Sequence, residues 1–296
     1  MTVASMPLAV GKKLNLFLDA IRYKESIFAL PFAYTGMILA ARGLPTLSQF
    51  IWISVAMVGA RTVGMAANRI IDRHIDARSP SKSSRHLPAG LLKTSEMIVL
   101  TLLASVVFLF AAYQLNMLAL ILAPVAAAYL VFYPYTKRFT WSSNLLLGWA
   151  LAISPSAAWI GVTGSLSWTP VLLSAAVAIW AGSFDILYHS QDFDFQRREG
   201  LHSVASRFGV VAAFRWSKVM DVIAVCVLIA VGVLASLAWP FYIGVAAAAG
   251  LLIYRHSLIS PEDTSRMGIA FMRVNAYVST SVFIATAVAL MIRAEG

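Results

Sequence analysis

The sequence predicts an all-α integral membrane protein, a bundle of nine transmembrane helices with a polar cavity that faces the cytoplasm. Of its 296 residues, 60% are hydrophobic and 12% are charged, which is about half the charged fraction of a soluble domain. The mean hydropathy is +0.78. Apolar runs of about 20 residues, the length that crosses a bilayer, recur along the chain, and charged residues gather between them. No linker or low-complexity tract divides the chain, so we expect a single domain over residues 1–296.

Nine apolar segments are long enough to be membrane spans. The connections after the second, fourth, sixth and eighth segments are charged, and the others are short and neutral. Before the first segment, Lys12 and Lys13 accompany Leu14, Phe17 and Ile21, a pattern typical of an amphipathic helix on the membrane surface. The expected spans lie near residues 25–41, 46–66, 96–113, 116–135, 143–163, 170–190, 217–236, 239–256 and 270–292.

The positive charge predicts the orientation. Of the 23 lysines and arginines, 20 fall in the N-terminal arm or in the charged connections. The positive-inside rule therefore places the N-terminus and the polar loops in the cytoplasm and the C-terminus outside, in a bacterial cytoplasmic membrane. The net charge of +10 then reflects topology and anionic lipid rather than nucleic acid, and nothing in the sequence calls for an obligate protein partner.

Cysteine and histidine offer little chemistry. The single cysteine, Cys226, excludes a disulfide framework and a thiolate metal site, and its apolar surroundings predict a buried packing role. The five histidines show no pair with ligand spacing on one face, so no histidine metal site is expected.

The first polar stretch, residues 68–90, carries a stripe of oxygen ligands. Asn68, Asp72 and Asp76 recur every four residues, and on a helix such residues share one face. Arginines and lysines follow, among them Arg85. Hard oxygen ligands beside cationic side chains favour a divalent cation such as Mg²⁺ together with an anionic group such as diphosphate.

The second polar stretch, residues 184–209, repeats this chemistry. Asp185 and Asp192 are seven residues apart, nearly one above the other on a helix, with Tyr188 between them. Carboxylates at membrane depth are costly and need a cation, a partner or an aqueous cavity. We therefore expect the two stripes to face each other across one cavity. The alternative is a pair of helix ends whose carboxylates are paired with neighbouring arginines.

Over essentially its full length the chain resembles the UbiA superfamily of intramembrane polyprenyl transferases. Three motifs carry the resemblance. The first is Asn68, Asp72 and Asp76 with Arg85 nine residues later; the second is Asp185, Tyr188 and Asp192 with the tail Gly200, Ser203, Phe208 and Gly209; the third is Tyr133, Pro134, Lys137 and Arg138.

The resemblance implies a nine-helix UbiA-type bundle, Mg²⁺ as cofactor, a polyprenyl diphosphate and a small aromatic acid as substrates, and the lipid bilayer as surroundings. It implies catalytic and metal-binding roles for four carboxylates, with Asn68 as a further ligand. Arg138 is implied to bind the carboxylate of the acceptor, although a positive-inside anchor is an alternative for it. The implied residues are Asp72, Asp76, Asp185 and Asp192 for catalysis, Arg85, Lys137, Arg69 and Tyr133 for the diphosphate, and Arg138 and Tyr188 for the acceptor.

One position departs from the family pattern. Gln196 stands where the family usually has Asp. A Gln carbonyl oxygen can still reach a cation, directly or through water, but with less charge. Asp194 lies about 160° from Asp192 on an ideal helix and replaces the missing ligand only if the helix end unwinds. Asp185 and Asp192 are thus the principal groups, and a weakened activity is the alternative.

The leading functional hypothesis is prenylation of 4-hydroxybenzoate in ubiquinone or menaquinone biosynthesis. The same chemistry on 1,4-dihydroxy-6-naphthoate in menaquinone biosynthesis is an alternative that the sequence does not separate from it. An ion-coupled secondary transporter is a rival from another class. It predicts broken helices and carboxylates near the midplane, whereas these carboxylates lie near helix ends.

Overall fold

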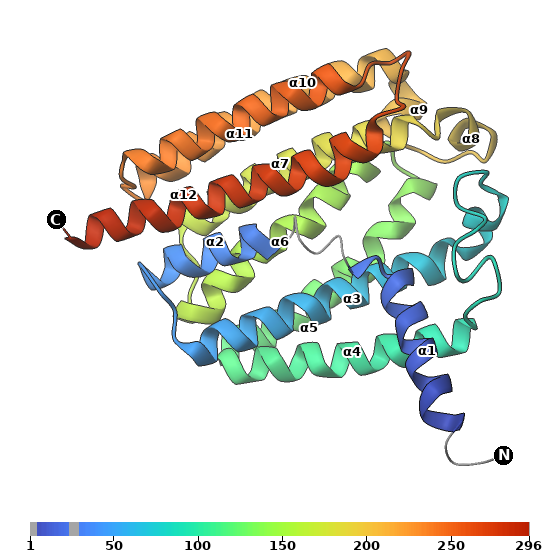
Figure 1. Cartoon of the computed structure of the whole chain (residues 1–296), viewed down its shortest axis with the longest axis horizontal. Helices are drawn as coiled ribbons and strands as arrows, with labels where there is room; N and C mark the ends of the chain where they lie inside the picture. Colours follow the sequence, from blue (N-terminus) through green and yellow to red (C-terminus); the bar gives the residue numbers. More distant parts are fainter. Residues whose placement is uncertain (1–4, 24–29, 296) are drawn as a thin grey trace.

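A computed structural model describes residues 5–23 and 30–295, and within these ranges the chain folds into helices without β-strands. Figure 1 shows long helices running roughly alongside one another, with the charged connections and the short helices α8 and α9 gathered at one end of the bundle. Eight helices of the described part are long and apolar enough to cross a membrane. The predicted all-α membrane bundle is therefore confirmed.

The elements follow the predicted spans closely. The helices that correspond to the nine expected spans are α2 (Leu30–Ala41), α3 (Leu47–Arg78), α4 (Thr94–Leu115), α5 (Met117–Phe132), α6 (Ser143–Thr163), α7 (Trp168–Ser190), α10 (Val210–Leu234), α11 (Trp239–Leu258) and α12 (Asn275–Glu295). The other elements are α1 (Ser5–Ala20), the 3₁₀ helix η2 (Tyr133–Arg138), α8 (Phe193–Arg198), α9 (Val204–Phe208) and the π-helix η3 (Ile269–Val274).

Three elements differ from the expected spans; one of them, α10, begins at Val210 rather than near residue 217. The first span was expected from residue 25, but residues 24–29 lie outside the described part, and α2 has 12 residues. The second was expected to end near residue 66, whereas α3 continues as a single helix of 32 residues to Arg78. The first stripe of oxygen ligands is therefore an extension of a membrane helix rather than a separate element.

Helix α6 packs closely against two neighbours. A Cβ atom on Gly148 would lie 2.2 Å from the carbonyl oxygen of Ala178 on α7, and one on Gly36 of α2 would lie 2.3 Å from the carbonyl oxygen of Pro155. Although Pro155 lies inside it, α6 runs as one helix from Ser143 to Thr163. The Ser154 hydroxyl donates to the carbonyl of Leu151, which is the carbonyl that a proline at position 155 leaves without its helical donor.

The interior of the bundle centres on α7. Leu173, Val177, Ala181 and Phe184 of this helix are buried in the largest apolar cluster. By contrast, large apolar side chains on α4, α5 and α10 are exposed, as expected for helices that face lipid tails. Cys226 of α10 is exposed as well. The predicted buried role of this cysteine is wrong, because an apolar neighbourhood in a membrane helix does not distinguish lipid from interior.

Helix α1 confirms the predicted N-terminal helix. Its Phe17 and Ala20, with the following Ile21, pack against Ala66, Leu92 and Met97. Lys13 forms an ion pair with Glu96 at the start of α4, and Asp19 lies 3.3 Å from the imidazole of His86. Figure 1 shows α1 crossing α3 and α4 obliquely. Helix α1 thus packs against both helices near the end of the bundle that carries the charged loops.

Candidate active site

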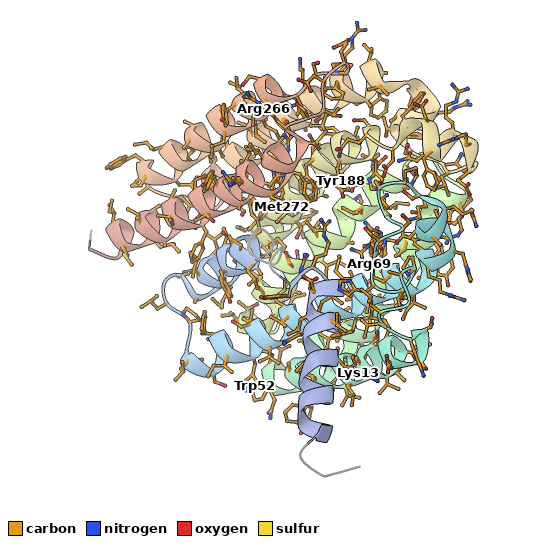
Figure 2. All side chains as sticks on the ribbon, turned by 45° about the vertical axis from the view of Figure 1, so that its right-hand side comes forward. Lys13, Trp52, Arg69, Tyr188, Arg266 and Met272 are labelled. Atoms are coloured by element: carbon orange, nitrogen blue, oxygen red, sulfur yellow. The ribbon has the colours of Figure 1, made fainter. Side chains whose placement is uncertain are left out.

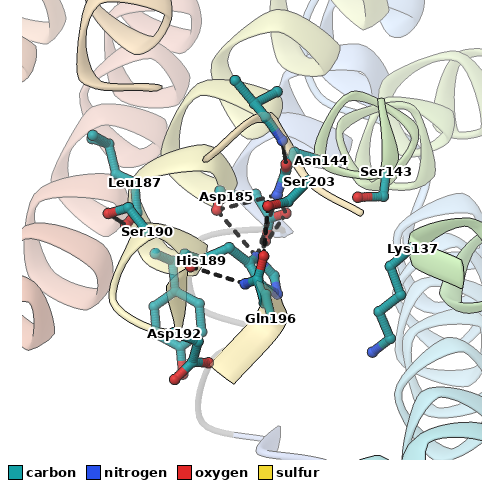
Figure 3. Close-up of polar contacts among 12 residues, drawn as sticks. Lys137, Ser143, Asn144, Asp185, Leu187, His189, Ser190, Asp192, Gln196 and Ser203 are labelled. Atoms are coloured by element: carbon teal, nitrogen blue, oxygen red, sulfur yellow. Dashed lines mark hydrogen bonds and ion pairs between the residues drawn. The ribbon is translucent and has the colours of Figure 1, made fainter. Parts of the chain in front are cut away.

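A polar cavity of about 60 Å³ lies at the charged end of the bundle. Its walls include Asn68 and Asp76 of α3, Lys137 of η2, Asn144 of α6 and Asp185 of α7. Figure 3 shows Lys137 reaching in from the opposite side to Asp185, His189 and Gln196. The helices that carry the two stripes thus border one cavity, as the sequence predicts.

The carboxylates of the first stripe are held by cations of this chain. Asp72 is buried, with 1% of its surface exposed. It forms ion pairs with Lys137 and with Arg138, whose guanidinium nitrogen lies 3.2 Å from Oδ1. Asp76 accepts from Arg85 at 2.7 Å. Both aspartates of the first stripe are therefore paired with lysine or arginine side chains of this chain.

Asp185 has different partners. Its Oδ2 accepts a hydrogen bond of 2.8 Å from the amide of Asn144 and lies 3.1 Å from Nδ1 of His189, one turn further along α7. Figure 3 shows these groups together. Asn144 also accepts from the backbone N–H of Val204 at 3.1 Å. In the described part of the chain, the side-chain partners of this carboxylate are therefore an amide and an imidazole rather than a lysine or arginine.

Asp192 does not stack on Asp185. Helix α7 ends at Ser190, and Asp192 lies in the connection to α8 with φ −97° and ψ 18°. The expectation of one continuous helix through both aspartates is wrong, because the chain turns before the second. The carboxylate of Asp192 instead accepts from Ser81 at 2.9 Å and pairs with Lys82 at 2.7 Å.

The charge of Asp192 is secured by these contacts. Burial raises the pKa of its carboxyl group, but the charge of Lys82 and the hydrogen bonds from Lys82 and Ser81 outweigh burial and bring the pKa below its ordinary value. A lowered carboxyl pKa stabilises the fold above the ordinary pKa, and that contribution is lost as the pH falls through the lowered value. Asp192 is therefore an anion throughout the neutral range.

These contacts fasten the loop after α3 to the segment after α7. Besides Asp192, Glu199 at the end of α8 is bound by Arg78 at 2.7 Å. We call the contacts Arg78–Glu199, Ser81–Asp192 and Lys82–Asp192 the loop latch. With the latch formed, the polar cavity of about 60 Å³ is far below the ≈300 Å³ that small ligands usually need.

The two uncertain ligands of the second motif point elsewhere. The side-chain amide of Gln196 donates to the carbonyl of His189 at 2.9 Å and accepts from the hydroxyl of Ser203 at 2.5 Å. Both ends of this side chain thus join the end of α7 to the start of α9, as Figure 3 shows. Asp194 on α8 is exposed and does not line the polar cavity.

Three of the remaining predicted residues, Arg69, Arg138 and Tyr188, do not line the cavity. Arg69 is buried and donates to the last carbonyl of α1, on Ala20, at 3.0 Å and to Asn68 at 3.3 Å, so it fastens α1 to α3. Arg138 also donates to the carbonyls of Pro134 and Ile71. Tyr188 packs against Phe271 of η3, with ring centroids 4.6 Å apart. Figure 2 labels Arg69 on the α3 side and Tyr188 on the α7 side of the molecule.

Several site residues escape the sequence motifs. Asn144, Lys82 and His202 line the cavity, and His202 donates its backbone N–H to the carbonyl of Lys137 at 2.7 Å. Ser143 donates to the carbonyl of His202 at 2.8 Å. The available signal was weak: Ser143 and Asn144 are two polar residues at the start of an apolar span, a place that usually means only a helix cap.

A second, apolar cavity of about 450 Å³ adjoins the polar one. It runs between α3, α4, α5 and α6, and its lining includes Met57, Phe108, Ala126 and Leu130. Tyr133 lines both cavities. From Tyr133 to Ala119, the far lining residue of α5, the helix rise corresponds to about 21 Å. The polar cavity and the long apolar cavity thus share one lining residue, Tyr133.

The donor set fits Mg²⁺ bound together with an anion. Within residues 5–23 and 30–295, no three Asp, Glu, His or Cys side chains converge as a ready metal cage. Mg²⁺ seldom uses such cages, since it keeps several waters and binds through one or two carboxylates plus substrate phosphates. Asn68, Asp76 and Asp185 on the cavity wall offer hard oxygen atoms of this kind.

Comparison with known proteins agrees with this geometry. Residues 29–277 match the UbiA prenyltransferase family. The 4-hydroxybenzoate octaprenyltransferase of Vibrio cholerae is 30% identical over 251 residues, which cover 83% of this chain and 86% of that protein. The apo structure of a UbiA homologue from Aeropyrum pernix K1 superimposes with a TM-score of 0.78 at 29% identity, covering 92% of this chain and 98% of the other. A UbiA homologue from Archaeoglobus fulgidus, solved with GPP and Mg²⁺ bound, shares the fold with a TM-score of 0.66 at 17% identity, covering 90% and 99%.

Proposed function

The chain belongs to the UbiA prenyltransferase family, and from this membership we propose that it transfers a polyprenyl group from polyprenyl diphosphate to an aromatic acid in quinone biosynthesis. The acceptor we propose is 4-hydroxybenzoate, the acceptor in the name of the Vibrio cholerae relative. The same reaction on 1,4-dihydroxy-6-naphthoate is the second candidate. We further propose that the polar cavity faces the cytoplasm, because 20 of the 23 basic residues fall in the arm and loops at that end.

One observation carries the proposal, namely the junction of the two cavities at Tyr133. A polyprenyl diphosphate has a strongly anionic head and a long apolar chain. The polar cavity supplies the lysine side chains Lys82 and Lys137 for the head, and the apolar cavity of about 450 Å³ supplies room for the chain beside the lipid tails. An ion-coupled transporter has no use for such an apolar compartment, so this geometry disfavours that rival.

When bound together with the diphosphate, Mg²⁺ would supply positive charge that neutralises the leaving group and eases the breaking of the allylic C–O bond. The residues that would hold it are Asp185, Asp192, Asp72, Asp76 and Asn68. The last two, with Asp185, line the cavity wall.

The cations of the site have a second role. Lys137 on Asp72 and Arg85 on Asp76 would turn from these carboxylates to the phosphate oxygens, which accept strong charge-assisted hydrogen bonds. We propose that Arg69 and Tyr133 also lie near the diphosphate head group. Arg69 holds α1 against α3 through its hydrogen bond to Ala20, and Tyr133 lines both cavities. Tyr188 and the fork of Arg138 are our candidates for orienting the aromatic acid.

The test is an assay of membranes that contain the protein, with Mg²⁺, a polyprenyl diphosphate and either aromatic acid. We expect a prenylated 4-hydroxybenzoate, identified by mass spectrometry, and loss of product on chelation of the metal. Product from the naphthoate alone would select the second acceptor. No product from any aromatic acid, together with solute uptake that needs no Mg²⁺, would favour transport instead.

A bulky residue in the apolar cavity should discriminate between donors by chain length. Ala126 of α5 lines this cavity, so Ala126→Phe narrows it. We expect kcat/KM with a long-chain polyprenyl diphosphate to fall about 10-fold, the scale of one overpacked site, and the value with dimethylallyl diphosphate to change little.

The neighbouring residue provides the control. Val125 of the same helix is 64% exposed, so Val125→Phe adds the same ring on the outer surface and should leave both donors unaffected. If Ala126→Phe and Val125→Phe behave alike, the cavity is not the site of the isoprenoid chain.

Restoring the family's aspartate at position 196 should lower activity rather than raise it. Gln196→Asp removes the N–H that donates to His189 and shortens the reach to Ser203. Leaving such buried groups unsatisfied costs about 1–3 kcal/mol, so we expect turnover to fall about 10-fold. Gln196→Glu, which keeps the length but not the donor, should be intermediate. A lower Mg²⁺ requirement and faster turnover in Gln196→Asp would instead identify position 196 as a metal ligand.

A further inference from the structure

A second buried polar network lies outside both cavities. Arg255 of α11, 1% exposed, pairs with Asp221 of α10 and donates to Ser183 of α7 at 2.8 Å and to Asn275 of α12 at 3.1 Å. Ser183 also donates to Asp221 at 2.7 Å. We call Ser183, Asp221, Arg255 and Asn275 the buried network. It joins four helices, and none of its members lines the polar or the apolar cavity.

Stability alone does not account for this network. Charges taken out of water lose much of their hydration, and apolar side chains of similar volume often replace a buried ion pair without loss of stability. Charged residues inside membrane helices face the interior and commonly serve function. The position of the buried network is therefore more informative than its strength.

The buried network reaches the second motif along two routes. The first is direct, since Ser183 lies two residues before Asp185 on α7, and its contacts restrict the rotation of that helix. The second passes through η3, because Asn275 donates to the carbonyl of Phe271 at 2.8 Å. The ring of Phe271 then packs on Tyr188 at 4.6 Å and on Phe184 at 5.3 Å.

The π-helix η3 contributes to the second route because it determines where the side chain of Phe271 lies. A π turn is rare and widens the helix locally, and such turns often accompany functional sites. Here η3 occupies residues 269–274, directly before Asn275, so the fixed amide of Asn275 and the widened turn together set where Phe271 lies. Figure 2 labels Met272 on this turn and Tyr188 on α7, close together in that view.

We propose that the buried network is a positioning element for the second motif, which sets the rotation of α7 through Ser183 and holds Tyr188 in place through Asn275 and Phe271. The inference rests on the proposed function, in which Tyr188 orients the aromatic acid. It adds residues on α10, α11 and α12 that act on the reaction without touching a substrate.

The kinetic test uses a charge-free replacement, Asp221→Leu with Arg255→Met, and a local variant, Phe271→Leu. We expect both to raise KM for the aromatic acid about 10-fold, and we expect Phe271→Leu, which leaves the contacts of Ser183 intact, to leave KM for the polyprenyl diphosphate within about twofold. Because both act through Tyr188, their combination should be no worse than the more severe of the two. Thr286→Val, a buried position of α12 whose hydroxyl bonds only within its own helix, should match the wild type.

A second readout does not depend on catalysis. In a Cys226→Ser background, Tyr188→Cys is alkylated with a water-soluble maleimide, with and without the charge-free replacement. We expect alkylation to become several-fold faster when the buried network is removed. If the charge-free replacement changes neither the alkylation rate nor KM for the acid, the inference is overturned. If it lowers the thermal stability but leaves KM for the acid unchanged, the buried network has only a structural role. A wild type that prenylates no acid would refute the proposed function, while the alkylation rates would still decide on the positioning.

Discussion

Asp185→Asn is expected to reduce turnover at least about 100-fold while the protein stays folded. Asp185 lines the polar cavity, and in the described part of the chain its partners are Asn144 and His189 rather than a lysine or arginine. It is thus the carboxylate that can receive a cation without displacing a cation of the protein. Even indirect partners of metal ligands are worth about 10- to 100-fold, so the loss of a ligand itself should exceed that range.

The measurement is the initial rate of prenylation across a range of Mg²⁺ concentrations, together with thermal unfolding in detergent. Asparagine has the shape of aspartate and can keep the contact with Asn144, so the melting temperature should stay near that of the wild type. Asp194→Asn is the matched control, because Asp194 belongs to the same motif but is exposed on α8. If Asp194→Asn were the inactive variant and Asp185→Asn the active one, the assignment of the second site would be wrong.

Lys137→Met is expected to lower kcat/KM for the polyprenyl diphosphate about 100-fold. Lys137 lines the polar cavity and pairs with Asp72, and its backbone is held by His202. A hydrogen bond to a charged group contributes about 1.5–3 kcal/mol, and the upper end of this range corresponds to about 100-fold. Methionine keeps the length of the side chain, and Asp72 retains Arg138, so the fold should survive.

The control for this variant is Lys218→Met, an exposed lysine of α10, which should behave as the wild type. The effect should appear mainly in KM for the diphosphate, since the aromatic acid has other proposed partners. Full activity in Lys137→Met would show that this lysine serves only to neutralise Asp72.

The sequence predicted the helices and the first stripe well, because both follow from simple spacing. Charged residues are so scarce that Asn68, Asp72 and Asp76 stand out at four-residue intervals, and α3 runs as one helix through all three. The second motif was predicted less well. Its spacing was interpreted on a continuous helix, but α7 ends at Ser190. The partners of Asp192 and Gln196 therefore cannot be derived from helical periodicity.

Contacts between distant segments were beyond the sequence. Asn144, Asp221 and Arg255 are polar residues near the ends of apolar spans, where no periodicity reveals their partners. The sequence also could not show whether an apolar side chain such as that of Cys226 is buried or faces outward. In a membrane the outer surface is as apolar as the interior, so the pattern that locates the core of a soluble protein loses its meaning.

The length of α3 affects where the anionic head and the apolar tail of a polyprenyl diphosphate would lie relative to the membrane. Its 32 residues correspond to about 48 Å, whereas the hydrocarbon layer is about 30 Å thick. Asn68, Asp72 and Asp76 lie within its last 11 residues, so a layer of this thickness that starts at the first residue of α3 ends before them. In the proposed reaction, the anionic head of the donor would then stay outside the medium of low dielectric constant, while the isoprenoid tail would stay within it. The new bond would form at the boundary between the two, and the prenylated product could pass sideways into the leaflet from which the donor came.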